Sequence, residues 1–177
     1  MGEGALEILI DEATIERRVH ELADAISSDY SGEGELILVG VLKGAFIFLA
    51  DLSRRLRIPR RIEFMAVSSY EEGNRETSAV RLLMDLRGNI AGRHVLLVED
   101  IVDTGRTLNF LKELLETRKP RSVKTCVLVR KPERVRVEAP VDYLGFEIPD
   151  AWVVGYGLDF DERNRTLPYI AAMKPES

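Results

Sequence analysis

Buried hydrophobic runs alternate with amphipathic segments along most of the chain. The segments 36–42, 94–100 and 122–129 contain runs of Val, Leu and Ile that are typical of strands buried on both faces of a sheet. Apolar residues recur at helical spacing in 11–30, 45–56 and 106–118, with Asp11 as a candidate N-cap. This alternation predicts an α/β fold with a central, mainly parallel sheet, right-handed crossovers and helices on both faces.

A predicted hairpin interrupts the alternation. The segments 61–70 and 79–86 have strand composition, and the polar stretch EEGNRETS, residues 71–78, lies between them as a loop. Two further strands are predicted at 142–147 and 152–158. The sequence contains no repeat, low-complexity segment or linker, so residues 1–177 are expected to form a single domain.

Composition and charge exclude several classes of protein. The net charge of −5 argues against a broad nucleic-acid-binding surface. No apolar stretch approaches the roughly 18 residues of a membrane span, and the N-terminus lacks the pattern of a signal peptide. The single cysteine, Cys126, lies in an apolar run and is expected to be a buried structural thiol in a reducing, cytoplasmic setting.

Candidate chemistry is concentrated after the predicted strand 94–100. Glu99 and Asp100 end this strand, and Asp103 follows three residues later. Ligands of open α/β sheets bind at the carboxyl ends of strands, and three acids there fit a ligand site better than a helix cap. The loop from Thr104 to Thr107 leads into a helix, whose N-terminus can bind an anion. The loop has neither the Walker A nor the G-x-G-x-x-G spacing, so neither P-loop hydrolysis nor dinucleotide binding is supported.

The stretch LLVEDIVDTGRT resembles the phosphoribosyl-pyrophosphate-binding motif of the type I phosphoribosyltransferases. VGVLKGAFIFLADL resembles the pyrophosphate loop of the hypoxanthine-guanine members, FMAVSSY the start of their flexible loop, and LVRKP and VDYLGFEIPDAWVVGYGLDFDERNR their purine-binding end. The chain is therefore identified as a member of this family, of the short bacterial kind, with a similarity that spans roughly residues 8–170. The resemblance implies the type I phosphoribosyltransferase fold, with a small hood formed by the terminal segments and a flexible loop at about 70–79.

The resemblance also implies the reaction. The 5-phosphoribosyl group of phosphoribosyl pyrophosphate would pass to hypoxanthine or guanine with Mg²⁺ as cofactor, giving IMP or GMP and pyrophosphate. The expected partners are these small molecules, with no nucleic acid and no membrane, and a homodimer or homotetramer is expected.

Residue roles follow from the same resemblance. Asp103 would be the general base at N7 of the purine, Glu99 and Asp100 would hold the ribose and the metal, and Asp159 would be a further Mg²⁺ ligand. The remaining phosphoribosyl and 5′-phosphate contacts would be Ile101, Val102, Thr104, Gly105, Arg106 and Thr107, and the pyrophosphate contacts would be Leu42, Lys43, Gly44 and Arg165, with a cis peptide between Leu42 and Lys43.

The purine would contact Lys131, Trp152 and Val153, and Ser69 and Tyr70 would begin the flexible loop. An ammonium only donates hydrogen bonds, so Lys131 would select a 6-oxopurine and reject adenine. Trp152 would stack on the base at a position where the family more often has Phe or Tyr.

Several alternatives remain open at this point. Asp103 could instead stabilise its own loop, Lys43 could be an exposed loop lysine, and Trp152 could pack in the core. The protein could be a xanthine or broad 6-oxopurine transferase. An RNA-binding regulator on the same fold needs a basic face, which the acidic net charge disfavours, and a purely structural homologue would be expected to lack the acids.

Overall fold

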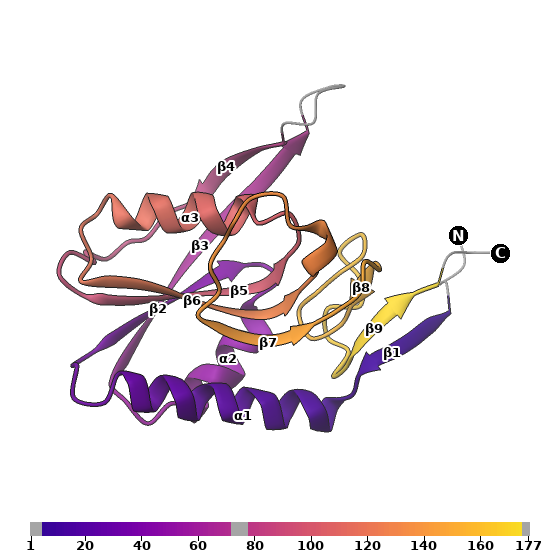
Figure 1. The fold of residues 1–177 in the computed structure, drawn as a ribbon, viewed down its shortest axis with the longest axis horizontal. Coiled ribbons are helices and arrows are strands. Elements are labelled where there is room, and N and C mark those ends of the chain that lie inside the picture. The colour runs from indigo at the N-terminus through magenta and orange to yellow at the C-terminus, as the bar shows by residue number, and fades with distance from the viewer. Residues whose placement is uncertain (1–4, 72–77, 175–177) are drawn as a thin grey trace.

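A six-stranded sheet forms the centre of the molecule in the computed structural model, which describes residues 5–71 and 78–174 (Figure 1). The strand order is β4-β3-β2-β5-β6-β7, and every neighbouring pair is parallel except β3 and β4. The strands are β2 (Leu36–Leu42), β3 (Arg60–Glu71), β4 (Ser78–Met84), β5 (His94–Val102), β6 (Ser122–Arg130) and β7 (Tyr143–Glu147). The predicted mainly parallel α/β fold is therefore confirmed.

Helices cover both faces of this sheet, as the alternation predicted. α1 (Glu12–Asp29) and α2 (Phe46–Arg55) pack together on one face, and α3 (Arg106–Glu116) lies on the other (Figure 1). The carboxylate of Asp11 accepts the Thr14 N–H at 2.8 Å, so the predicted N-cap is present. The apolar stripe of α1, from Ile15 to Ile26, is buried, and each face of the sheet has its own hydrophobic core.

A separate three-stranded sheet joins the two ends of the described chain. It has the order β1-β9-β8, with β1 (Leu6–Ile10), β9 (Ile170–Met173) and β8 (Val153–Val154) all antiparallel. The predicted strand 152–158 is wrong after residue 154, because Gly155, Tyr156 and Gly157 have φ values of 100°, 50° and 103°, which no strand can accommodate. Both terminal strands were missed by the sequence analysis.

The predicted hairpin is formed by β3 and β4, which pair from Ala66 and Met84 outward. The expected flexible loop falls largely on residues 72–77, which lie outside the described residues. Ser69 and Tyr70 belong to β3 by their backbone, while their side chains are outside the description.

Two smaller expectations concern the core and the surface. Cys126 is a free, fully buried thiol in β6, and burial raises its pKa. Among the described residues, no helix combines the length and the apolar character needed to cross a bilayer.

Candidate active site

A crevice of about 380 Å³ opens at the carboxyl end of β5. Its walls come from the ends of β2 and β5, from Val67 in β3, from the first turn of α3 and from the segment that follows β8. The crevice therefore brings together most of the predicted phosphate and ribose contacts, namely Leu42, Lys43, Gly44, Glu99, Asp100, Ile101, Val102, Asp103, Thr104, Gly105, Thr107, Asp159 and Arg165. Arg106 begins α3 and lies outside the crevice lining.

Glu99 and Asp100 form the acidic floor of the crevice. Glu99 is 5% exposed, and its Oε1 accepts the Asp100 N–H at 3.1 Å, while Asp100 Oδ1 accepts the Ile101 N–H at 2.7 Å. Burial raises the pKa of Glu99 well above its ordinary value, and the neighbouring Asp100 raises it further. Burial also raises the pKa of Asp100, but hydrogen bonds from Glu99 and from the backbone oppose this shift. Glu99 is therefore the more readily protonated member of the pair.

The loop after β2 rests directly on Asp100. The peptide between Leu42 and Lys43 is cis, as the resemblance implied. A Cβ built on Gly44 would lie 1.6 Å from Asp100 Oδ2, and a Cβ on Gly157 would lie 2.0 Å from the Gly44 carbonyl oxygen. Three segments that are distant in sequence thus meet without room for one extra methyl group. The Lys43 ammonium is exposed and contacts Glu162 Oε2 at 2.9 Å.

The loop after β5 is shaped by Gly105. Its φ is +86°, and a Cβ there would lie 2.3 Å from the Val137 carbonyl oxygen. The Thr104 carbonyl oxygen accepts the N–H groups of Arg136 at 3.0 Å and Val137 at 3.1 Å, which ties the loop to the segment after β6. Glycine is therefore required for both conformation and space, and α3 begins at the next residue with its N-terminus at the crevice.

A smaller hollow of about 190 Å³ adjoins the crevice and shares part of its wall. It is lined by Asp100, Ile101, Asp103, Lys131, Trp152, Val153, Leu158 and Asp159, so it brings together all three predicted purine contacts. Lys131 is 7% exposed. Its backbone N–H donates to the Val102 carbonyl oxygen at 3.0 Å, which fixes the residue beside the end of β5. Trp152 is 59% exposed and packs edge-on against Phe160, so the alternative of core packing is wrong.

Asp103 lies between the crevice and the hollow. Its Oδ1 accepts a hydrogen bond from Arg134 Nε at 2.9 Å, and its Oδ2 lies 3.9 Å from Lys131 Nζ. The side chain of Asp103 is 39% exposed, so it remains accessible from the cavity. Contact with Asp103 raises the pKa of the Arg134 guanidinium, which was not among the predicted site residues.

Arg165 and Asp159 form the remaining wall. Arg165 Nη1 lies 3.0 Å from Asp159 Oδ1 and donates to the Gly157 carbonyl oxygen at 2.8 Å. Within the described residues, the Arg165 Nε is buried without a hydrogen-bond partner. Arg165 also lines the crevice, and a guanidinium in that position suits an anionic ligand.

The carboxylates of this wall can contribute to a Mg²⁺ site but do not enclose one. In residues 5–71 and 78–174, no three His, Cys, Asp or Glu side chains come together as a metal cluster. Mg²⁺ in phosphate-transfer sites is usually held by one or two carboxylates together with waters and substrate phosphates. Asp159, which lines both cavities with Asp100, fits this kind of shared coordination.

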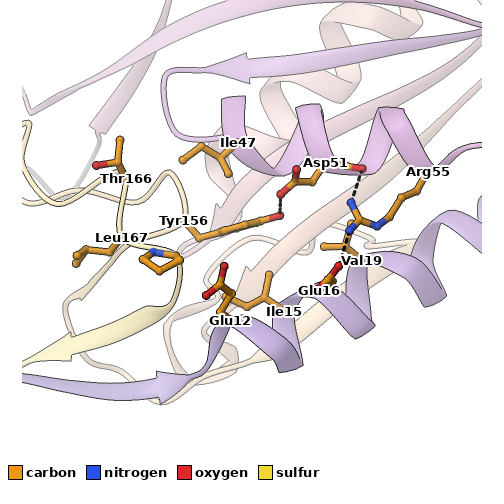
Figure 2. A pocket seen from close by; sticks show the side chains of 11 residues that line it. Glu12, Ile15, Glu16, Val19, Ile47, Asp51, Arg55, Tyr156, Thr166 and Leu167 are labelled. Atoms are coloured by element: carbon orange, nitrogen blue, oxygen red, sulfur yellow. Dashed lines mark hydrogen bonds and ion pairs between the residues drawn. The ribbon is translucent and has the colours of Figure 1, made fainter.

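A further hollow of about 350 Å³ lies between α1, α2 and the segment 156–168 and shares no lining residue with the crevice (Figure 2). The Tyr156 hydroxyl donates to Asp51 Oδ2 at 2.5 Å across this hollow, and Arg55 reaches Glu16 at 3.0 Å. Tyr156 directly precedes Gly157, which packs closely against the Gly44 carbonyl oxygen. The Tyr156–Asp51 hydrogen bond therefore anchors the segment that supports the Gly44 loop.

Sequence reasoning missed three charged residues that contact predicted ones. Glu162 pairs with Lys43, and Arg134 and Asp150 approach Asp103 and Lys131. The charges of Arg134 and Asp150 are visible in the stretches RKPERV and IPDAW. The contacts of these two residues depend on where η1 (Pro132–Arg134) and the end of β7 lie in the fold.

Known proteins are similar to this chain over nearly its whole length. A family model described as "Phosphoribosyl transferase domain" matches residues 6–161. The hypoxanthine-guanine phosphoribosyltransferase of Dictyostelium discoideum is 47% identical over 96% of each chain, and the hypoxanthine phosphoribosyltransferase of Escherichia coli K12 is 45% identical over 93% of each. A crystal structure of a hypoxanthine-guanine phosphoribosyltransferase from Bacillus anthracis has a TM-score of 0.90 at 43% identity, covering 95% of this chain and 98% of that one.

Proposed function

Because the chain belongs to the phosphoribosyl transferase family, and within it to the hypoxanthine-guanine phosphoribosyltransferases, we propose that it converts hypoxanthine and guanine to IMP and GMP. The reaction joins the base to C1 of phosphoribosyl pyrophosphate and releases pyrophosphate. The protein is thus a transferase of purine salvage.

One observation carries the proposal: an acidic floor, an anion-binding helix N-terminus and a buried lysine surround two connected cavities. The large crevice has the polar lining and the size for a ribose that carries a 5′-phosphate and a pyrophosphate. The smaller hollow, with Trp152 beside Lys131, has the shape and chemistry for a flat oxo-bearing base.

The proposed roles follow the course of the reaction. The bond from C1 to pyrophosphate breaks as a cation-like ribose forms, so the site must stabilise a departing polyanion and hold the sugar. Arg165, Lys43 and the Gly44 backbone would bind the pyrophosphate, and the loop 104–107 would bind the 5′-phosphate. Glu99 and Asp100 would accept hydrogen bonds from the ribose hydroxyls.

Asp103 and Lys131 would orient the base. Asp103 would accept the N7 proton, and Lys131 would donate to the 6-oxygen. Adenine offers an amino group at that position, so an ammonium gains no hydrogen bond from it. The proposal therefore covers 6-oxopurines, with xanthine as the closest competitor.

Mg²⁺ would bind on the Asp159 side, shared between this carboxylate and the substrate oxygens, and would neutralise the pyrophosphate charge. The protein's own contribution there is the Arg165–Asp159 pair at 3.0 Å, which fixes the carboxylate at the mouth of the crevice.

Assembly is a further part of the proposal, with a second copy of this chain as the partner. Phe46, Ile62 and Phe64 are large apolar side chains exposed on α2 and β3, near the antiparallel edge of the sheet. A homodimer or homotetramer would cover them.

We place this reaction in the cytoplasm. We also propose that the small β1-β9-β8 sheet is the hood over the base.

A steady-state assay with phosphoribosyl pyrophosphate and Mg²⁺ tests the function. Hypoxanthine or guanine should be converted, adenine should not, and Asp103→Asn should lower kcat about 100-fold or more with little loss of nucleotide binding. Turnover of adenine comparable with hypoxanthine, or an unchanged rate in Asp103→Asn, would contradict the proposed roles.

A further inference from the structure

Four charged side chains form a closed ring at the purine end of the site. Arg134 Nε lies 2.9 Å from Asp103 Oδ1 and 3.9 Å from Asp150 Oδ1. Lys131 Nζ lies 3.9 Å from Asp103 Oδ2 and 3.8 Å from Asp150 Oδ1. Acid and base alternate around the ring, so each cation contacts both carboxylates and each carboxylate contacts both cations.

The two sides of this ring differ in their relation to the small hollow. Lys131, which is nearly buried, and Asp103, which is 39% exposed, both line the hollow, whereas Arg134 and Asp150 are each 45% exposed and do not line it. Asp103 follows β5, Lys131 and Arg134 follow β6, and Asp150 follows β7. The ring therefore lies at the carboxyl ends of three neighbouring parallel strands. The Asp103–Lys131 side faces the cavity, and the Arg134–Asp150 side faces outward.

Lys131 is held midway between two carboxylates. Its distances to Asp103 and Asp150 are almost equal, and both exceed ordinary hydrogen-bond length. Its N–H donors therefore remain available to a ligand. If Asp150 lost its charge, the attraction of the ammonium to Asp103 would be unopposed by a second carboxylate.

We propose that Asp150 is a positioning residue for the base: it holds Lys131 away from Asp103 so that the ammonium can donate to a 6-oxo group. This inference rests on the proposed function and adds a residue that no motif singled out. Without Asp150, Lys131 would close on Asp103, and the two groups meant to face the base would satisfy each other instead. Arg134 serves as the counterpart that keeps Asp103 from moving toward Lys131.

The test compares the binding of two nucleotides by calorimetry: the product IMP and its analogue purine riboside 5′-monophosphate, which lacks the 6-oxygen. Asp150→Asn should weaken IMP binding about tenfold, because a charge-assisted hydrogen bond is weakened, and should change the affinity for the second nucleotide less than twofold. Asp150→Glu, which keeps the charge, should restore most of the difference. Asp24→Asn removes an acid from a comparable exposed ion pair with Arg57 and should change neither affinity.

The possible outcomes separate this inference from the proposed function. If the wild type binds neither nucleotide, the function itself is wrong. If the wild type prefers IMP, but Asp150→Asn lowers both affinities equally or lowers neither, the positioning role of Asp150 is overturned while the function stands. Circular dichroism of each variant shows whether the fold is intact.

Discussion

Gly44→Ala is the substitution for which the structure gives the sharpest expectation. The added Cβ would lie 1.6 Å from Asp100 Oδ2 and 2.4 Å from Asp100 Cγ. The first distance is roughly 1.4 Å short of the 3.0 Å that real Cβ contacts respect. Either the loop that carries Lys43 or the acid beneath it must therefore move by more than an ångström.

This displacement sets the expected magnitude. A misplacement of about 1 Å in an oriented site costs on the order of 100-fold in rate, equivalent to about 2.7 kcal/mol of transition-state stabilisation. Overpacking at the same position costs about 1–3 kcal/mol of folding stability. We expect kcat/KM for phosphoribosyl pyrophosphate to fall about 100-fold, while the protein remains folded and unfolds at a moderately lower temperature.

Gly88→Ala is the matched control. Neither glycine has a left-handed φ, and a Cβ on Gly88 would also meet a carboxylate oxygen, Glu63 Oε1 at 2.8 Å. That oxygen is the far end of a side chain outside the crevice, so it can turn away. Steady-state kinetics with saturating hypoxanthine compares the two variants. If Gly44→Ala keeps the wild-type kcat/KM, the close contact between the loop and the acid does not determine the geometry of the site.

Three further predictions address selectivity, anchoring and pH. Lys131→Gln should lower kcat/KM for hypoxanthine about 10- to 100-fold, because one charge-assisted hydrogen bond to the base is lost. The KM for phosphoribosyl pyrophosphate should stay within a factor of about two of the wild-type value. An equal rise in the KM values of both substrates would contradict this prediction. Tyr156→Phe should lower the free energy of unfolding in urea by about 1–3 kcal/mol, because the Asp51 carboxylate loses its hydrogen bond from the Tyr156 hydroxyl. An unchanged urea midpoint would mean that this hydrogen bond contributes nothing to stability. The pKa of Glu99 is raised on folding, so the native state binds the extra proton, and wild-type stability in EDTA should fall as the pH rises above the ordinary value of 4.5. Glu99→Gln should reduce this loss and leave only the part contributed by Asp100, whose pKa is also raised. A parallel pH dependence in both proteins would refute the assignment.

The central sheet and its helices were predictable because their signals are local. The stripe from Ile15 to Ile26 and the run from Leu36 to Leu42 show helical spacing and continuous burial within a single segment. The acids at the end of β5 were predictable in place, since the carboxyl ends of parallel strands share one edge. The cis peptide at Leu42 came only from the family resemblance.

The rest depended on contacts between distant segments. β1 and β9 are short. β1 is a strand because it pairs with β9 across more than 150 residues of chain, and β9 also pairs with β8. Tyr156 was predicted in a strand because it lies in the mostly apolar stretch WVVGYGL, but the close approach of Gly157 to Gly44 requires a left-handed backbone there. The approach of Asp150 to Lys131 likewise depends on the ends of two neighbouring strands and leaves no mark in the local sequence.

A crystal structure of the protein with IMP, pyrophosphate and Mg²⁺ would show where the substrates bind. We expect the 5′-phosphate at the loop 104–107, the ribose hydroxyls at Glu99 and Asp100, and the 6-oxygen within hydrogen-bond distance of Lys131 Nζ. A nucleotide bound in the hollow between α1 and α2, or elsewhere away from the end of β5, would contradict this expectation.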